Sequence, residues 1–271
     1  MVNGAHAEEN AVQKAIDDAC GRGERRLKLP PAVYRINPPQ GQGSHLRLRG
    51  MKDFEVDATG STLILEKLES AGVIFENCSN VSFRGGIIRR ANFPFSQGDI
   101  AAIAADRSYL DIRIHDGYPD DMDSPYFKAS PILTIFERTG KLKRDILDLD
   151  LRIKSIEKRA ERQFRFHLLK PFNADMPLEV GDMAAWRKLT REQVFVLNCE
   201  KMSFSGVTIK NAPAVAVAER GGEGRNYYSY TVTYDDPPKG AVQKPLLSGA
   251  ADGFNSADVR NGAILENCLL E

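Results

Sequence analysis

The sequence lacks the features that mark several large classes of protein. No apolar run approaches the roughly eighteen residues that a membrane-spanning helix requires, and the first residues have neither the charged nor the apolar region of a signal peptide. Lys plus Arg and Asp plus Glu both total 37, so the formal net charge is zero and no basic excess favours a nucleic-acid partner. We therefore expect neither nucleic acid nor membrane among the partners.

Cysteine, histidine and tryptophan are also scarce. Four cysteines in 271 residues, with no C-x-x-C pair, indicate neither a disulfide scaffold nor a zinc site. The four histidines are scattered, which predicts neither a metal ligand set nor a Ser-His-Asp triad. We predict no metal and no obligatory cofactor.

What the sequence does contain is a repeat. "IFENCSNVSFRGGIIRRAN" begins at Ile74, "FVLNCEKMSFSGVTIKNAP" begins at Phe195, and a shorter copy, "AILENCLLE", begins at Ala263. A repeated short β unit, broken at Asn and Gly, is typical of a solenoid, in which equivalent residues of successive rungs stack at about 4.8 Å. Three repeated cysteines are then expected on one buried ladder: Cys78, Cys199 and Cys268.

The remaining segments predict a cap and an insert. Val12, Ile16 and Ala19 have helical spacing, and a short amphipathic helix here would cover the open edge of the first rung. From about 106 to 191 the repeat gives way to alternating segments such as "LDLDLRIKSI", joined by Gly, Pro and Asp turns, which indicates antiparallel strands. We predict a cap and first rungs over 1–105, an inserted β domain over 106–191 and further rungs over 192–271.

These motifs resemble a known group of proteins. "LPPAVYRI", "FENCSNVSFRGGIIRR", "VTIKNAPAVAV" and "AADGF" with "AILENCLLE" are similar to right-handed parallel β-helix carbohydrate-active enzymes, whose clan includes the polygalacturonase-like glycoside hydrolases. "FSQGDI", "LDIRIHDGYP" and "LEVGD" resemble β-helix proteins similar to α-1,3-galactosidases, which carry a small β-barrel. The resemblance implies an all-β protein: a right-handed parallel β-helix with an N-terminal helical cap and an inserted small antiparallel β-barrel or sandwich.

The resemblance also implies a catalytic residue. In polygalacturonase-like enzymes an Asn-Thr-Asp-Gly stretch is followed, one rung later, by an Asp-Asp pair. Here "AADG" matches that stretch, which makes Asp252 the candidate catalytic carboxylate, although Ala250 and Ala251 depart from the pattern. By the same comparison the chain ends at Glu271, just before the expected pair, and it would leave an open last rung through which we expect self-association.

Other polar residues of the same rungs are candidate substrate contacts. Glu219 and Arg220 precede the Gly-rich turn "GGEGRN", and Asn255, Asp258 and Arg260 follow Asp252. Such side chains can bind sugar hydroxyls or a uronate carboxylate. The alternative interpretation of the Gly-rich segment is a plain solvent-exposed turn.

We therefore predict a glycoside hydrolase that cleaves a polysaccharide, oligosaccharide or galactoside by aspartate acid/base catalysis in a β-helix cleft. We expect it in the extracellular space or periplasm, as most members of the group are. One alternative is a polysaccharide lyase of the same fold, which would use Ca²⁺. The acidic stretch "DGYPDDMDSPYF" lacks the ligand spacing of a calcium loop and lies in the insert. A second alternative is a carbohydrate-binding or adhesive β-helix without catalysis.

Overall fold

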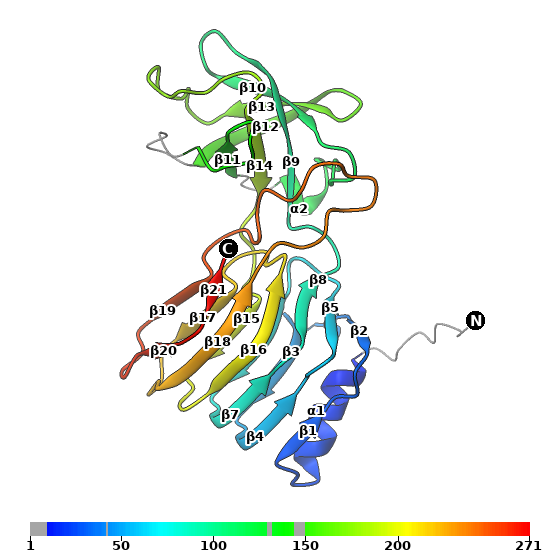
Figure 1. Cartoon of the computed structure of the whole chain (residues 1–271), viewed down its shortest axis with the longest axis vertical. Helices are drawn as coiled ribbons and strands as arrows, with labels where there is room; N and C mark the ends of the chain where they lie inside the picture. The colour runs from blue at the N-terminus through cyan, green and yellow to red at the C-terminus, as the bar shows by residue number, and fades with distance from the viewer. Residues whose placement is uncertain (1–9, 42, 129–131, 144–149) are drawn as a thin grey trace, which may run out of the picture. The chain divides into compact units, whose positions relative to one another are not determined.

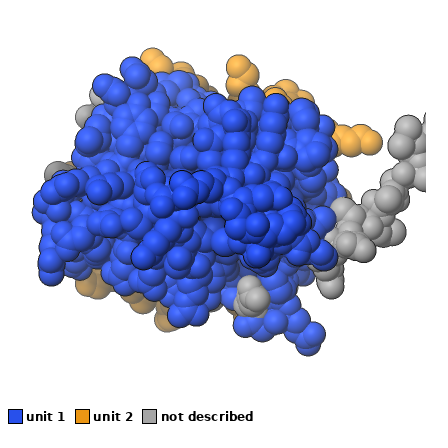
Figure 2. Space-filling view, turned by 90° about the horizontal axis from the view of Figure 1, so that it is seen from below, with its two compact units in different colours: residues 1–92, 189–234, 251–271 blue, residues 93–188, 235–250 orange. Residues whose placement is uncertain are grey.

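The structure, a computed structural model, describes residues 10–41, 43–128, 132–143 and 150–271, and most of its regular structure is β-strand (Figure 1). The chain divides into two compact units, coloured separately in Figure 2. Unit 1 comprises Met1–Asn92, Leu189–Tyr234 and Ala251–Glu271, and unit 2 comprises Phe93–Lys188 and Asp235–Ala250. Two separate segments of unit 2 therefore interrupt the chain of unit 1.

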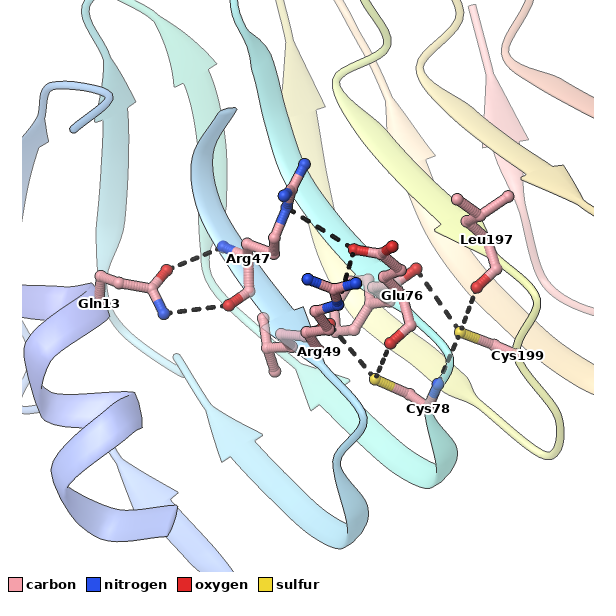
Figure 3. Close-up of polar contacts among 9 residues, drawn as sticks. Gln13, Arg47, Arg49, Glu76, Cys78, Leu197 and Cys199 are labelled. Atoms are coloured by element: carbon pink, nitrogen blue, oxygen red, sulfur yellow. Dashed lines mark hydrogen bonds and ion pairs between the residues drawn. The ribbon is translucent and has the colours of Figure 1, made fainter. Parts of the chain in front are cut away.

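Helix α1 begins unit 1 and has the predicted amphipathic character. It spans Ala11–Gly21 and buries Val12, Ile16 and Ala19, the three residues whose spacing predicted it. Gln13 of the same helix reaches the edge strand β3 (Ser44–Arg49). Its side-chain Nε2 donates to the Arg47 carbonyl at 3.0 Å, and the Arg47 N–H donates to its Oε1 at 2.8 Å (Figure 3). The side-chain amide thus satisfies backbone groups that an edge strand otherwise leaves open.

Successive passes of the chain add strands to two parallel sheets of unit 1 (Figure 1). In spatial order, the five-stranded sheet contains β19 (Phe254–Ala257), β17 (Val217–Arg220), β15 (Val194–Leu197), β6 (Ala71–Glu76) and β3 (Ser44–Arg49). The ten-stranded sheet contains β1 (Arg26–Lys28), β2 (Val33–Ile36), β4 (Lys52–Asp57), β5 (Thr62–Leu65), β7 (Ser79–Arg84), β8 (Ile87–Arg90), β16 (Ser203–Lys210), β18 (Asn226–Val232), β20 (Ala263–Leu265) and β21 (Leu269–Leu270). Each pass runs from the first sheet into the second.

The core of unit 1 lies on the inward faces of these sheets, because side chains alternate along each strand. One inward row of the five-stranded sheet is wholly apolar: Leu46, Val73, Val194, Val217 and Phe254. On the ten-stranded sheet the Phe83 and Phe204 rings stack with their centroids 5.8 Å apart. Equivalent residues of successive passes therefore stack upon one another, as the repeat predicted.

A row of left-handed residues marks the corner where each pass leaves the five-stranded sheet. These residues directly follow the paired strand ends and all have positive φ, between 51° and 63°: Gly50, Asn77, Asn198, Gly221 and Asp258. Gly and Asn are the residues that adopt this conformation most readily, and Asp also tolerates it. The row explains why the repeat is broken at Asn and Gly.

The predicted cysteine ladder holds for two of its three members. Cys78 and Cys199 follow the left-handed corners of adjacent passes, both are buried, and the Cys78 N–H donates to the Cys199 sulfur at 3.4 Å (Figure 3). The neighbouring Cys78 sulfur and burial raise the pKa of the Cys199 thiol, so it stays protonated in the core. Cys268 lies instead between β20 and β21, where its thiol donates to the Tyr228 carbonyl at 3.4 Å. The prediction that Cys268 lies on this ladder was wrong.

Unit 2 contains a closed antiparallel barrel, with strand order β10-β13-β12-β11-β14-β9. The strands are β9 (Phe95–Ile103), β10 (Tyr109–Ile114), β11 (Ile132–Phe136), β12 (Asp150–Ala160), β13 (Gln163–Leu168) and β14 (Met183–Arg187). Trp186 is buried against Phe127 of the short helix α2 (Pro125–Lys128) and against Phe166, with ring centroids 4.4 and 5.6 Å away. In the described ranges, no helix is long and apolar enough to cross a membrane.

The boundaries of the predicted insert differ from those of unit 2. β9 begins at Phe95, before the predicted start at 106, because it completes the barrel between β10 and β14. Residues 235–250, predicted to belong to the rungs, also lie on the barrel. Leu246 packs there against Phe136 and Met183, and its N–H donates to Oε1 of Gln97 at 2.8 Å. The segment has no strand periodicity that would have assigned it to either unit.

Candidate functional site

Asp252 lies two residues before the start of β19 and is exposed to solvent. Its carbonyl accepts the Ala216 N–H at 2.9 Å, which fixes its backbone against the preceding pass. Its carboxylate accepts a hydrogen bond from Nδ2 of Asn255 at 3.2 Å. The residue that the resemblance implied as catalytic is therefore accessible and held by a neighbour that was also predicted to belong to the site.

Asn255 and Arg220 point outward from adjacent strands. Asn255 of β19 pairs with Ala218 of β17, and Arg220 is two residues further along the same face of β17. Nη1 of Arg220 donates to the Asn255 carbonyl at 3.2 Å and to the Glu219 carbonyl at 2.7 Å. The structure thus brings three predicted residues together, and we call Asp252, Asn255 and Arg220 the Asp252 face.

Glu219 does not belong to this face, and its predicted contact with substrate is wrong. It shares the inward direction of Val217, and only 1% of its surface is exposed. Its carboxylate accepts hydrogen bonds from the Tyr228 hydroxyl at 2.7 Å, from Nδ2 of Asn226 at 3.1 Å and from Oγ of Ser256 at 2.7 Å. The same register row holds Leu48, Phe75 and Val196 in earlier passes, so a carboxylate here needs these three donors.

Tyr228 is the most deeply buried of these donors. Burial and the adjacent Glu219 carboxylate raise the pKa of Tyr228 far above its usual range, because loss of its proton would place a second negative charge beside the first. The raised pKa keeps the hydroxyl protonated, so it can donate its hydrogen bond to Glu219.

Asp258 and Arg260 were predicted as substrate contacts, and the structure gives both a place in turns. Asp258 occupies the left-handed corner position, with φ of 60°, that Asn198 and Gly221 occupy in the two preceding passes. Nη1 of Arg260 donates to Oε1 of Glu223 at 2.7 Å, and both side chains are exposed. The corner requirement and this ion pair explain both residues without a ligand.

The outer face of the five-stranded sheet also carries charges that the sequence reasoning missed. Arg47 and Arg49 of β3 point outward, and their Nε atoms lie 3.9 and 3.6 Å from one carboxylate oxygen of Glu76 (Figure 3). Arg49 and Arg220 lie on one register row, separated by Glu76 and Leu197. The alternation Leu46, Arg47, Leu48, Arg49 was the signal that could have found them.

The chemistry of the Asp252 face is limited by its strands. The outward positions of β17 and β19 hold Ala218, Arg220, Asn255 and Ala257, so Asp252 supplies the carboxylate at this edge. Glycoside hydrolysis needs two carboxyl groups, about 5 to 9.5 Å apart. Within the part of the chain that the structure describes, no group of three or more His, Cys, Asp or Glu side chains could hold a metal ion.

Solved structures that resemble this chain include two of low similarity. No protein-family model matches the sequence, and no curated protein matches it. A provisionally assigned glycosyl hydrolase from Parabacteroides merdae has 13% identity and a TM-score of 0.40, with 99% of this chain and 92% of that one aligned. The Gp54 tailspike of Acinetobacter baumannii bacteriophage AP22, solved with a capsular saccharide, has 9% identity and a TM-score of 0.22, over 96% of this chain and 48% of that one. At these scores neither protein informs the chemistry of this chain.

Proposed function

We propose that unit 1 is a right-handed parallel β-helix of the carbohydrate-active type. The support is the succession of passes that add strands in register to two parallel sheets, the row of left-handed corners and the α1 cap. In such a fold a ligand can lie along the outer face of one sheet, where equivalent positions of successive passes form straight rows.

On this framework the protein acts as a glycoside hydrolase, and Asp252 is its acid/base residue. The observation that carries this proposal is an exposed carboxylate held by Asn255, whose backbone carbonyl accepts a hydrogen bond from the Arg220 guanidinium. An aspartate so placed can activate water or protonate a leaving oxygen, while amide and guanidinium groups bind sugar hydroxyls. A polysaccharide substrate fits a protein of the extracellular space or periplasm.

A second function is supported by the composition of the same face. Because the outward positions of β17 and β19 hold no carboxylate besides that of the preceding Asp252, the face can bind a glycan without cleaving it. In that case Asp252, Asn255 and Arg220 serve as hydrogen-bonding groups only.

One experiment separates the two functions. Galactan, pectin and carrageenan are incubated with the wild-type chain, with Asp252→Asn and with Asp175→Asn, which alters an exposed aspartate of unit 2. Release of reducing sugar by the wild type and Asp175→Asn, but not by Asp252→Asn, supports hydrolysis. Binding of one glycan without release supports the binding face. Absence of both release and binding with all three glycans contradicts both proposals.

A further inference from the structure

The buried Glu219 carboxylate lies directly beneath the Asp252 face. Glu219 of β17 and Ser256 of β19 are register partners on the inward face of their strands, and Oγ of Ser256, which is an exposed residue of the edge strand, donates to Oε1 of the buried Glu219 at 2.7 Å. Ser256 follows Asn255 in the chain, so the two side chains leave the strand on opposite faces. Pinning Ser256 inward therefore fixes the outward direction of Asn255.

Asn255 in turn holds the reactive group, because its Nδ2 donates to Oδ2 of Asp252 at 3.2 Å. A continuous path thus runs from the interior to the outer face. It passes from the Glu219 carboxylate to the Ser256 hydroxyl, along the backbone to Asn255, and on to the Asp252 carboxylate.

The surroundings of Glu219 indicate that its carboxylate does more than fill the core. Its register row is apolar in three earlier passes, where Leu48, Phe75 and Val196 fill the same space. A buried carboxylate is costly compared with such residues, even when all its hydrogen bonds are made. The polar residue occurs in the pass next to Asp252, and its donors come from β18 and β19.

We propose that Glu219 is a positioning residue of the Asp252 face, which acts through Ser256 to hold Asn255 and Asp252 in place. This inference rests on the proposed function for its consequence in catalysis, but its geometry can be tested without a substrate. The role differs from the predicted one, since Glu219 never contacts the glycan.

The test uses two variants that each remove one hydrogen bond from Glu219. Ser256→Ala removes the bond to β19, whereas Tyr228→Phe removes the bond to β18 and keeps the ring that packs on Phe254, with centroids 5.1 Å apart. Urea unfolding of Ser256→Ala and Tyr228→Phe measures how much each lost hydrogen bond lowers the free energy of unfolding. Ser256→Thr, which keeps the hydroxyl, serves as the conservative rescue, and Glu219→Gln disturbs the acceptor itself.

The readout is the side-chain amide signal of Asn255 in a nitrogen-proton NMR spectrum, assigned by its loss in Asn255→Ser. Asp252→Asn shows how far the signal moves when its acceptor is changed. We expect Ser256→Ala and Glu219→Gln to move the signal comparably, whereas Tyr228→Phe and Ser256→Thr leave it at the wild-type position. An unmoved signal in Ser256→Ala, or an equal shift in Tyr228→Phe, would show that Glu219 serves stability alone and would overturn the proposal.

Kinetics then separate this inference from the proposed function. If galactan, pectin or carrageenan is hydrolysed, Ser256→Ala should lower kcat by up to about a hundredfold with little change in KM, since small displacements of a reacting group cost that much. An unchanged kcat would contradict the positioning role. If Asp252→Asn leaves sugar release unchanged while the NMR series behaves as expected, the proposed function fails and the positioning role of Glu219 stands.

Discussion

The most direct test of the fold concerns the Gln13 side chain at the edge of the five-stranded sheet. Gln13→Ala removes both hydrogen bonds to the backbone of Arg47, at 2.8 and 3.0 Å. Each such bond contributes about 1 kcal/mol, so we expect the free energy of unfolding to fall by about 2 kcal/mol. Exposure of the edge backbone should also raise the tendency to aggregate. Urea unfolding followed by circular dichroism measures the first effect and light scattering the second.

The adjacent residue provides the control. Lys14→Ala replaces a residue of the same helix with similar helix propensity, and it removes an ion pair to Asp18 whose side chains are 69% and 47% exposed. Exposed pairs of this kind contribute at most about 0.5 kcal/mol. If Gln13→Ala costs no more stability than Lys14→Ala, the side-chain amide does not act as the edge cap described above.

Three further changes test other parts of unit 1. The His45 ring is buried, and burial with the nearby Arg90 lowers its pKa from 6.5 to about 4, so the unfolded chain takes up a proton first as pH falls. The stabilising contribution of neutral His45 should be complete above about pH 6.5 and reduced by about 2 kcal/mol at pH 5. Urea unfolding at these two pH values measures the difference, and His45→Gln should abolish this part of the pH dependence. Phe204→Ala, which removes a ring stacked on Phe83, should cost about 3 to 5 kcal/mol, whereas a loss below about 1 kcal/mol would contradict the core described here. At the left-handed corner, Asp258→Gly should preserve the free energy of unfolding, whereas Asp258→Val should lower it by about 1 to 2 kcal/mol. Equal melting temperatures of these two variants would disprove the corner role.

Local pattern was sufficient wherever one residue's conformation or face decided the outcome. The spacing of Val12, Ile16 and Ala19 predicted α1, and the repeated Asn-Cys pairs predicted that Cys78 and Cys199 stack. The same reasoning misplaced Cys268 for a physical reason. Asn77 and Asn267 both adopt left-handed conformations, with φ of 53° and 55°, but at different corners of a pass. The same need for a left-handed residue therefore places an Asn-Cys pair at two different corners.

The site could be predicted only in part, because burial of polar groups depends on partners from other strands. Alternation along β17 places Glu219 inward beside Val217, yet its charge suggested the surface. The donors that make burial tolerable are Asn226, Tyr228 and Ser256, and only the register of three strands brings them together. The resemblance and the shared rungs singled out Asp252, Asn255 and Arg220, and strand register places them on one face, while their role as a site stays a prediction.

The pairing of the two ends of the barrel bears on how the chain folds. Cys78 and Cys199 are in contact although 121 residues separate them, a span that would make their encounter slow if it were a flexible loop. Inside unit 2, however, Phe95 pairs with Arg187 in adjacent antiparallel strands. Once the barrel has formed, it shortens the effective loop between Cys78 and Cys199 from about 120 residues to about 30, which lowers the entropic cost of closure by about 1 kcal/mol. Barrel formation before sheet assembly would therefore bring two segments that are far apart in the sequence of unit 1 within reach of a much shorter loop.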